Sequence, residues 1–191
     1  MPPPNRERRD QLADAAMRVL AADGTRGLTH RAVDTEGGVP SGTTSRYFPT
    51  RDALLQAVAD RTRQLQLAAI ERLAPGPGDP ARLPEAIARN FREVLAARPD
   101  HPMVLFELLL EGSRRPELRS ALAEAARART AATLRICGDA GVKLSESDAK
   151  LLLMMAEGVA LAVLTTDPEA LDEVEGNIRS GAESILAKYG G

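Results

Sequence analysis

The sequence lacks several features on which secreted, membrane and disulfide-bonded proteins depend. It contains a single cysteine, Cys137, so an intrachain disulfide is excluded. We expect Cys137 to be a small buried hydrophobic residue in a reducing cytoplasm rather than a redox sensor. The longest apolar runs, 151–156 and 159–164, fall far short of the roughly 20 residues of a membrane span. The N-terminus also has no apolar segment of a signal peptide. These absences predict a cytoplasmic protein with no membrane association.

The sequence also has no large excess of either charge and few residues of the kinds that form metal or catalytic sites. The chain has 25 Lys and Arg against 27 Asp and Glu, a net charge of −2, which argues against a generally polybasic nucleic-acid coat but leaves a local basic surface possible. The two histidines and the cysteine form no cluster with metal-ligand spacing, and no Gly-rich phosphate loop is present. No nucleophile, base and orienting group stand out together. We therefore expect no metal, no cofactor and no enzymatic activity.

Apolar and helix-favouring residues are abundant. Hydrophobic residues make up 43% of the 191 positions and alanine alone supplies 32, enough for a core in one domain or two small ones. Apolar residues recur at intervals of three and four, and no useful segment alternates with period two. The pattern predicts an all-α fold of about nine helices. Outside the segment from 28 to 49, the expected helices cover about 12–24, 50–73, 84–97, 102–111, 116–136, from 145 onward, and 167–188.

Helix boundaries are marked by capping residues. We expect Gly24 to end the first helix and Thr50 to cap the start of the next long one. Ser145 with Asp148 matches a capping box, and Asp167 followed by Pro168 reads as the start of the last helix. Residues 74–84 hold four prolines and two glycines, so this segment is predicted to be a loop or linker.

The helix that begins at Ser145 has apolar residues all around its axis. A helix on the surface of a monomer shows only one apolar stripe. We therefore expect this helix to be buried on two sides, by the core and by a second subunit, rather than completely inside a monomer.

Two short helices are predicted between residues 29 and 48. Thr29 can cap one that runs to about Glu36, Gly37 and Gly38 form a turn, and a second helix runs from about Pro40 to Phe48. This arrangement is typical of a helix-turn-helix, whose second helix enters the major groove of DNA. Residues 37–51 contain two arginines and no carboxylate, and small or hydroxyl side chains allow a close approach to the duplex.

The first part of the chain resembles the DNA-binding domain of the tetracycline-repressor (TetR) family of transcriptional regulators. The resemblance runs from about Arg8 to Val58 and rests on Leu28-Thr29-His30-Arg31-Ala32-Val33, Gly38-Val39-Pro40-Ser41-Gly42-Thr43 and Tyr47-Phe48-Pro49-Thr50-Arg51-Asp52-Ala53-Leu54-Leu55. It implies a DNA-binding domain over 1–50 and a helical effector-binding and dimerisation domain over 51–191. The residues it assigns to DNA are Thr29, Arg31, Ser41, Thr43, Thr44, Arg46, Tyr47 and Arg51. Thr29 and Arg51 are expected at phosphates, and Thr43, Thr44 and Arg46 at base edges.

Four positions depart from the family pattern. Many members have Leu-Tyr where this chain has Thr44-Ser45, and small alanines where it has Asp34 and Gly37. We expect Asp34 to face solvent or an arginine. Arg6, Arg8 and Arg9, near the N-terminus, either reach additional phosphates or belong to a tail without a role.

The family resemblance also implies partners. They are a palindromic double-stranded operator, a second copy of the chain bound through the last two helices, and a small-molecule effector of unknown identity. The alternative function is an all-α small-molecule binding protein that no longer reads DNA. Each apolar candidate for lining the effector pocket could instead be ordinary core: Phe91, Met103, Phe106, Leu110, Met154 and Met155. Glu107 could orient a cationic ligand in this pocket or could face water.

Overall fold

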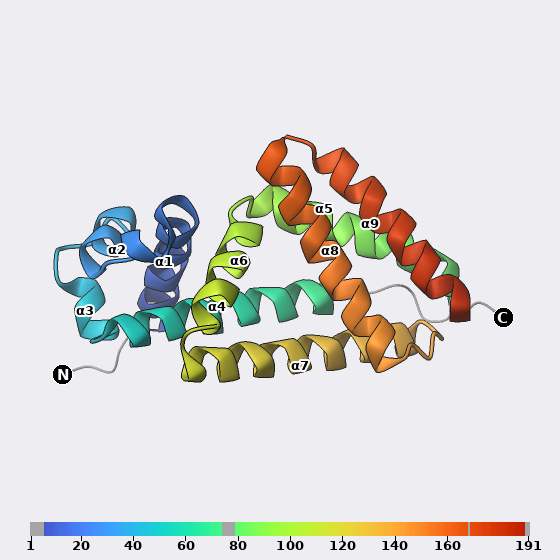
Figure 1. The fold of residues 1–191 in the computed structure, drawn as a ribbon, viewed down its shortest axis with the longest axis horizontal. Helices are drawn as coiled ribbons and strands as arrows, with labels where there is room; N and C mark the ends of the chain where they lie inside the picture. The colour runs from blue at the N-terminus through green and yellow to red at the C-terminus, as the bar shows by residue number, and fades with distance from the viewer. Residues whose placement is uncertain (1–5, 74–78, 168, 190–191) are drawn as a thin grey trace. The chain divides into compact units, whose positions relative to one another are not determined.

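The computed structural model in Figure 1 describes residues 6–73, 79–167 and 169–189. Within these residues the chain forms nine α-helices and two short 3-10 helices, and no strand, so the all-α prediction is confirmed. The α-helices are α1 Arg6–Gly27, α2 His30–Glu36, α3 Thr43–Tyr47, α4 Arg51–Arg72, α5 Leu83–Ala97, α6 His101–Gly112, α7 Pro116–Asp139, α8 Glu146–Thr166 and α9 Leu171–Leu186. The 3-10 helices are η1 Pro80–Arg82 and η2 Ala187–Tyr189.

The helices belong to two compact units. The first contains the described residues up to Leu65 together with Met103–Ala125, and the second contains Gln66–Pro102 and the described residues from Ala126 onward. Helices α4 and α7 therefore contribute one part of their length to each unit. The functional division at residue 50 stays a prediction, since these units follow packing rather than function.

The core of the first unit is formed by the apolar faces of its helices. Leu12 and Leu20 of α1, Val33 of α2 and Leu54 of α4 are fully buried, together with Phe48 at the end of α3. This packing stabilises the short helices α2 and α3, which are too short to be stable alone.

The core of the second unit is built around α9, which packs against α5 and α8. Its buried stripe includes Val174, Ile178 and Ala182, spaced by four residues as one helix face requires. Cys137 lies in the same core, and burial raises the pKa of its thiol to about 11. The predicted role of Cys137 as a small core hydrophobe is confirmed.

Three predicted N-caps are present. The side-chain oxygens of Thr29, Thr50 and Ser145 accept hydrogen bonds from backbone N–H groups three residues further on, at 3.0–3.1 Å. Each bond satisfies a donor that the first helical turn leaves without an intrahelical partner. At Gly24 the backbone adopts φ +65°, which breaks the regular geometry of α1, although the helix continues in a further turn to Gly27.

Two predicted helix starts are wrong. Asp167 ends α8, because its N–H donates to the carbonyl of Val163, and α9 begins later, at Leu171; Pro168 lies outside the described residues. The second helix of the helix-turn-helix begins at Thr43 rather than Pro40, because Gly42 has the left-handed φ of +85°. The predicted linker at 74–84 lies partly outside the described residues, and its last part forms η1 and the start of α5.

Helix α8 has both a buried and an exposed apolar face. Leu152, Leu153 and Ala156 are buried, whereas the side chains of Leu151 and Met154 are 50% and 69% exposed. By length and composition alone this helix could also cross a membrane. The exposed face agrees with the sequence pattern, and its cover by a second subunit stays a prediction.

Candidate DNA-binding site and effector domain

The turn between α2 and α3 depends on two glycines. Gly38 and Gly42 have φ values of +62° and +85°, a backbone region that residues with a β-carbon rarely adopt. The two glycines change the chain direction so that α3 follows α2 after only six residues, as a helix-turn-helix requires.

Asp34 of α2 holds the start of α3. Its carboxylate accepts hydrogen bonds from the backbone N–H groups of Gly42 and Thr44, each at 2.7 Å, and from the Thr44 hydroxyl at 2.6 Å. Gly42 has no side chain with which to cap α3, so Asp34 takes that part from the preceding helix. The expectation that Asp34 faces solvent or an arginine is wrong, because unpaired N–H groups at a helix start attract a carboxylate.

The charge of Asp34 is stabilised by these bonds. Burial by itself raises the pKa of a carboxyl group, but the hydrogen bonds from Thr44 and Gly42 outweigh it and hold the pKa of Asp34 below its usual value. Thr44 is fully buried in this arrangement. We therefore assign Thr44 to the positioning of α3 rather than to base contact.

Several of the other residues assigned to DNA lie at the surface. Thr29, Arg31, Ser41 and Arg46 are exposed, and Thr43 and Tyr47 are half-buried. Within the described part of the chain neither Arg31 nor Arg46 has an ion-pair partner, so both guanidinium groups are available to an external anion. The Thr43 hydroxyl donates to the carbonyl of Pro40 at 2.5 Å and keeps its acceptor capacity.

Arg51 has a structural role that the sequence did not indicate. Its guanidinium donates to the backbone carbonyls of Leu28, at 2.6 Å, and of Thr25. These two bonds tie the first turn of α4 to the last turn of α1 and to the connection that follows it. No sequence signal identified them, because the partners are backbone atoms more than twenty residues away.

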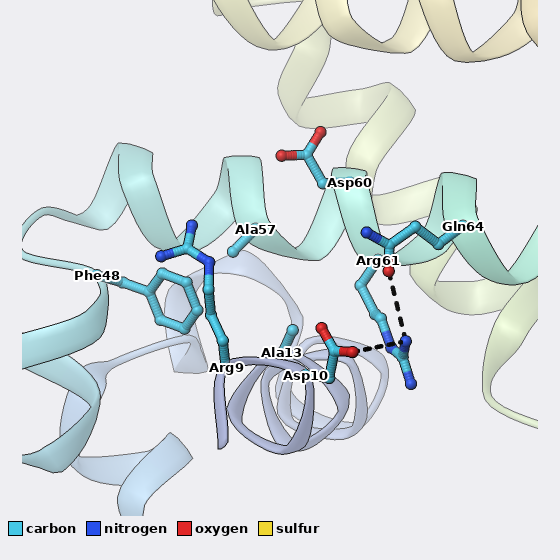
Figure 2. Close-up of a pocket in the computed structure, with 8 residues that line it drawn as sticks. All are labelled: Arg9, Asp10, Ala13, Phe48, Ala57, Asp60, Arg61 and Gln64. Atoms are coloured by element: carbon cyan, nitrogen blue, oxygen red, sulfur yellow. Dashed lines mark hydrogen bonds and ion pairs between the residues drawn. The ribbon is translucent and has the colours of Figure 1, made fainter. Parts of the chain in front are cut away.

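The N-terminal part of α1 is attached to the end of α3. The guanidinium of Arg9 lies 4.8 Å from the centre of the Phe48 ring, a cation–π distance, and also donates to the carbonyl of Tyr47 at 3.4 Å. Figure 2 shows Arg9 and Phe48 at one side of a small polar hollow, with the Arg61 side chain directed towards Asp10 at the other side. Arg9 is thus part of a folded helix, and Arg6 and Arg8 on the same helix are exposed.

The candidate pocket residues are divided between the two units. Met103, Phe106, Glu107 and Leu110 belong to the part of α6 in the first unit, and Phe106 and Leu110 are more than 40% exposed. The second unit contains the other three, of which Phe91 and Met155 pack at the edge of its core and Met154 is exposed.

A polar cluster inside the second unit was not anticipated from the sequence. Gln66 of α4, His101 of α6, Arg129 of α7 and Glu157 of α8 are linked by hydrogen bonds and an ion pair. Burial lowers the pKa of His101 to about 4, so this histidine is neutral at physiological pH. One signal could have been used: Glu157 is a lone carboxylate between the two longest apolar runs of the chain.

No metal site accompanies these features in the part of the chain that the structure describes, where no three His, Cys, Asp or Glu side chains are grouped to hold an ion.

Two family models match the chain. The model described as bacterial regulatory proteins of the tetR family covers residues 12–58, and the model of a tetracyclin repressor-like C-terminal domain covers residues 78–188. Among curated proteins, the chain is 41% identical over 105 residues to the transcriptional repressor LfrR of Mycolicibacterium smegmatis. These residues are 53% of this chain and 50% of LfrR. It is 33% identical over 94 residues to the transcriptional regulator BetI of Burkholderia ambifaria, 48% of each chain. The chain spans about half the length of the curated relatives it matches.

Solved structures match over nearly the whole length. The multidrug binding protein EbrR, complexed with imidazole, is 32% identical with a TM-score of 0.67, covering 95% of this chain and 96% of that one. The TetR-family member SCO1917 from Streptomyces coelicolor is 31% identical with a TM-score of 0.72, covering 94% and 98%. The resemblance inferred from the sequence is confirmed, and the family consists of helix-turn-helix regulators rather than enzymes. The chain belongs to the TetR family of bacterial transcriptional regulators.

Proposed function

We propose that the chain is a homodimeric repressor that binds a palindromic operator and releases or recruits it in response to a small molecule. The observation that carries the DNA-binding part is the anchoring of α3 by Asp34, which fixes the helix while leaving Arg46 exposed and without an ion-pair partner among the described residues. A rigid helix with a free guanidinium is what base or phosphate recognition needs.

The proposed contacts follow from this exposure. Arg46 and Thr43 face base edges in the major groove, and Ser41 and Tyr47 donate to phosphates or bases. Thr29 and Arg31, at the start of α2, lie where a phosphate would be attracted by the helix terminus. Arg51, at the start of α4, is proposed to orient the phosphate-facing end of this helix, since its own guanidinium already bonds two carbonyls.

Dimerisation through α8 and α9 is proposed from the exposed apolar residues of α8. Leu151 and Met154 would be covered by the same surface of a second copy. A two-fold dimer would place its two recognition helices roughly 34–36 Å apart, one turn of DNA, and so would require a palindromic operator.

The effector is proposed to bind the C-terminal helices. Support comes from EbrR, whose solved structures are described as complexes of a multidrug binding protein with proflavin, ethidium and malachite green, at 30–32% identity to this chain. A ligand changes operator affinity only if it binds one conformation of the dimer more tightly than the other. Such a regulator would act in the cytoplasm, where bacterial DNA is accessible.

Footprinting of the protein on the promoter region of its own gene tests this function. We expect a protected palindrome whose affinity falls steeply with salt, because phosphate contacts release counterions. Arg46→Ala and Tyr47→Ala should each abolish protection without unfolding the protein. Arg119→Ala, which removes an exposed arginine of α7, is the matched control and should protect the site as the wild type does. Absence of any protected site at low salt would favour the alternative, a ligand-binding protein that does not read DNA.

A further inference from the structure

The polar cluster of the second unit links four helices, and the Glu157 carboxylate contacts two of its members directly. Glu157 Oε1 forms an ion pair with Arg129 and accepts a weak hydrogen bond from Gln66 Nε2 at 3.5 Å. Gln66 Nε2 also lies 3.3 Å from His101 Nε2. Gln66 is carried by α4, the helix whose first residue is Arg51, so this cluster and the DNA-binding region share a continuous helix.

Arg129 and Glu157 are largely removed from water but not sealed. Their side chains are 12% and 21% exposed, so part of each side chain remains in contact with solvent. Arg129 Nε is buried and has no hydrogen-bond partner in the described part of the chain. The same is true of Asp100 Oδ2. Buried polar atoms without partners are uncommon in folded proteins, and a bound polar or charged group is one explanation for them.

The negative charge of Glu157 is incompletely balanced. Burial raises the pKa of Glu157 even though Arg129 acts in the opposite direction. His101 is neutral and adds no positive charge, while Asp100 and Arg98 act on His101 with opposite signs. A further positive group near Glu157 would therefore be stabilised, whereas a negative one would be repelled.

We propose that Glu157 is the anchor for a cationic effector, with Arg129 holding the position that the cationic group of the ligand takes when it binds. The ligand class is an organic cation, which displaces the Arg129 guanidinium from the carboxylate. Gln66 offers a polar group beside the same oxygen, and His101 in turn lies beside the Gln66 amide. This inference rests on the proposed function, since it assigns the effector site of that regulator. It also gives a physical connection to α4 through Gln66.

The first test measures binding of ethidium to the full-length protein by fluorescence, in the absence of DNA. Ethidium is permanently charged, so its own protonation does not enter. Glu157→Gln keeps the side-chain shape and removes the charge, and we expect it to weaken ethidium binding roughly tenfold or more. Glu93→Gln, at an exposed position of α5, is the matched control and should bind as the wild type does. Equal affinities of wild type and Glu157→Gln would overturn the proposal.

The second test uses Arg129→Gln and separates displacement from a purely structural role. If Arg129 competes with the ligand for Glu157, its removal should strengthen ethidium binding several-fold at mildly alkaline pH, which favours the ionised form of this carboxyl group. Weaker binding in Arg129→Gln would contradict displacement. Glu157→Asp keeps the charge on a shorter side chain and should retain part of the affinity lost in Glu157→Gln. This variant covers the case in which the glutamine variant folds poorly.

Two further outcomes separate this inference from the proposed function. Tighter binding of the anionic probe anilinonaphthalene sulfonate than of ethidium, with dependence on Arg129, would overturn the cation assignment while operator footprinting stays positive. Glu157-dependent ethidium binding by a protein that protects no operator would support the site and overturn the regulator.

Discussion

The hydroxyl of Thr44 donates a 2.6 Å hydrogen bond to the carboxylate of Asp34, and both side chains are buried. The same carboxylate accepts two backbone N–H groups at the start of α3. A buried hydrogen-bonded carboxylate is costly to disturb, because any group left without its partner keeps the full desolvation penalty. This pair therefore sets the position of α3 within the first unit.

Loss of the Asp34 carboxylate should destabilise the first unit and impair DNA binding. Asp34→Ala leaves two N–H groups and the Thr44 hydroxyl without an acceptor, so we expect the free energy of unfolding to fall by about 2–3 kcal/mol. Thr44→Val, which removes one hydroxyl at nearly constant shape, should cost only about 1 kcal/mol. Urea denaturation measures both values. Equal stabilities of wild type and Asp34→Ala would contradict the assigned role.

Arg51 should be more important for folding than for direct phosphate contact. Lysine cannot reproduce a planar fork that donates to two separate carbonyls, so Arg51→Lys should lower the free energy of unfolding by about 1–2 kcal/mol although the charge is kept. Thermal denaturation followed by circular dichroism checks this expectation. A lysine variant as stable as the wild type, but with weaker operator binding, would instead favour a direct phosphate contact.

His101 should make the stability depend on pH in the mildly acidic range. Its pKa is about 4 in the folded protein and ordinarily 6.5, so the unfolded chain binds more protons between these values and stability falls as the pH decreases from 6.5 towards 4. From about pH 7 to about pH 5 we expect His101 to account for a loss of about 2 kcal/mol. Urea denaturation of wild type and His101→Gln at both pH values isolates this contribution. An identical pH dependence in the two proteins would contradict it.

Cys137 should be inert in the folded protein. The side chain is 2% exposed and burial raises the pKa of the thiol to about 11, so little thiolate is present near neutral pH. Alkylation by iodoacetamide, followed by mass spectrometry, should be very slow in buffer and fast in concentrated urea. Rapid labelling without denaturant would show that this core opens readily.

Met154 should be needed for assembly if α8 is part of the dimer interface. Met154→Asp places a charge on an exposed apolar face of α8 and should leave the monomer folded while preventing dimerisation. Light scattering coupled to gel filtration measures the mass. Glu169→Gln, which changes an exposed residue between α8 and α9, is the control. A dimeric Met154→Asp variant would place the interface elsewhere.

Much of the fold was determined by features that are local in the chain. Three- and four-residue spacing of apolar side chains identifies the helices, and the hydroxyls of Thr29, Thr50 and Ser145 locate three of their starts. Each of these signals involves residues that are only three or four positions apart, so the sequence alone is sufficient to identify them.

Other features were decided only by tertiary structure. From the sequence, Asp34 is expected at the surface, but in the folded chain the start of α3 presents backbone N–H groups to it. Arg51 is expected to bind a phosphate, but folding brings two distant backbone carbonyls to its guanidinium. Gln66, His101, Arg129 and Glu157 are far apart along the chain, and only helix packing unites them. Capping and periodicity are short-range interactions that the sequence displays directly. The surroundings of a buried charge depend on which helices meet, and only the folded chain specifies them.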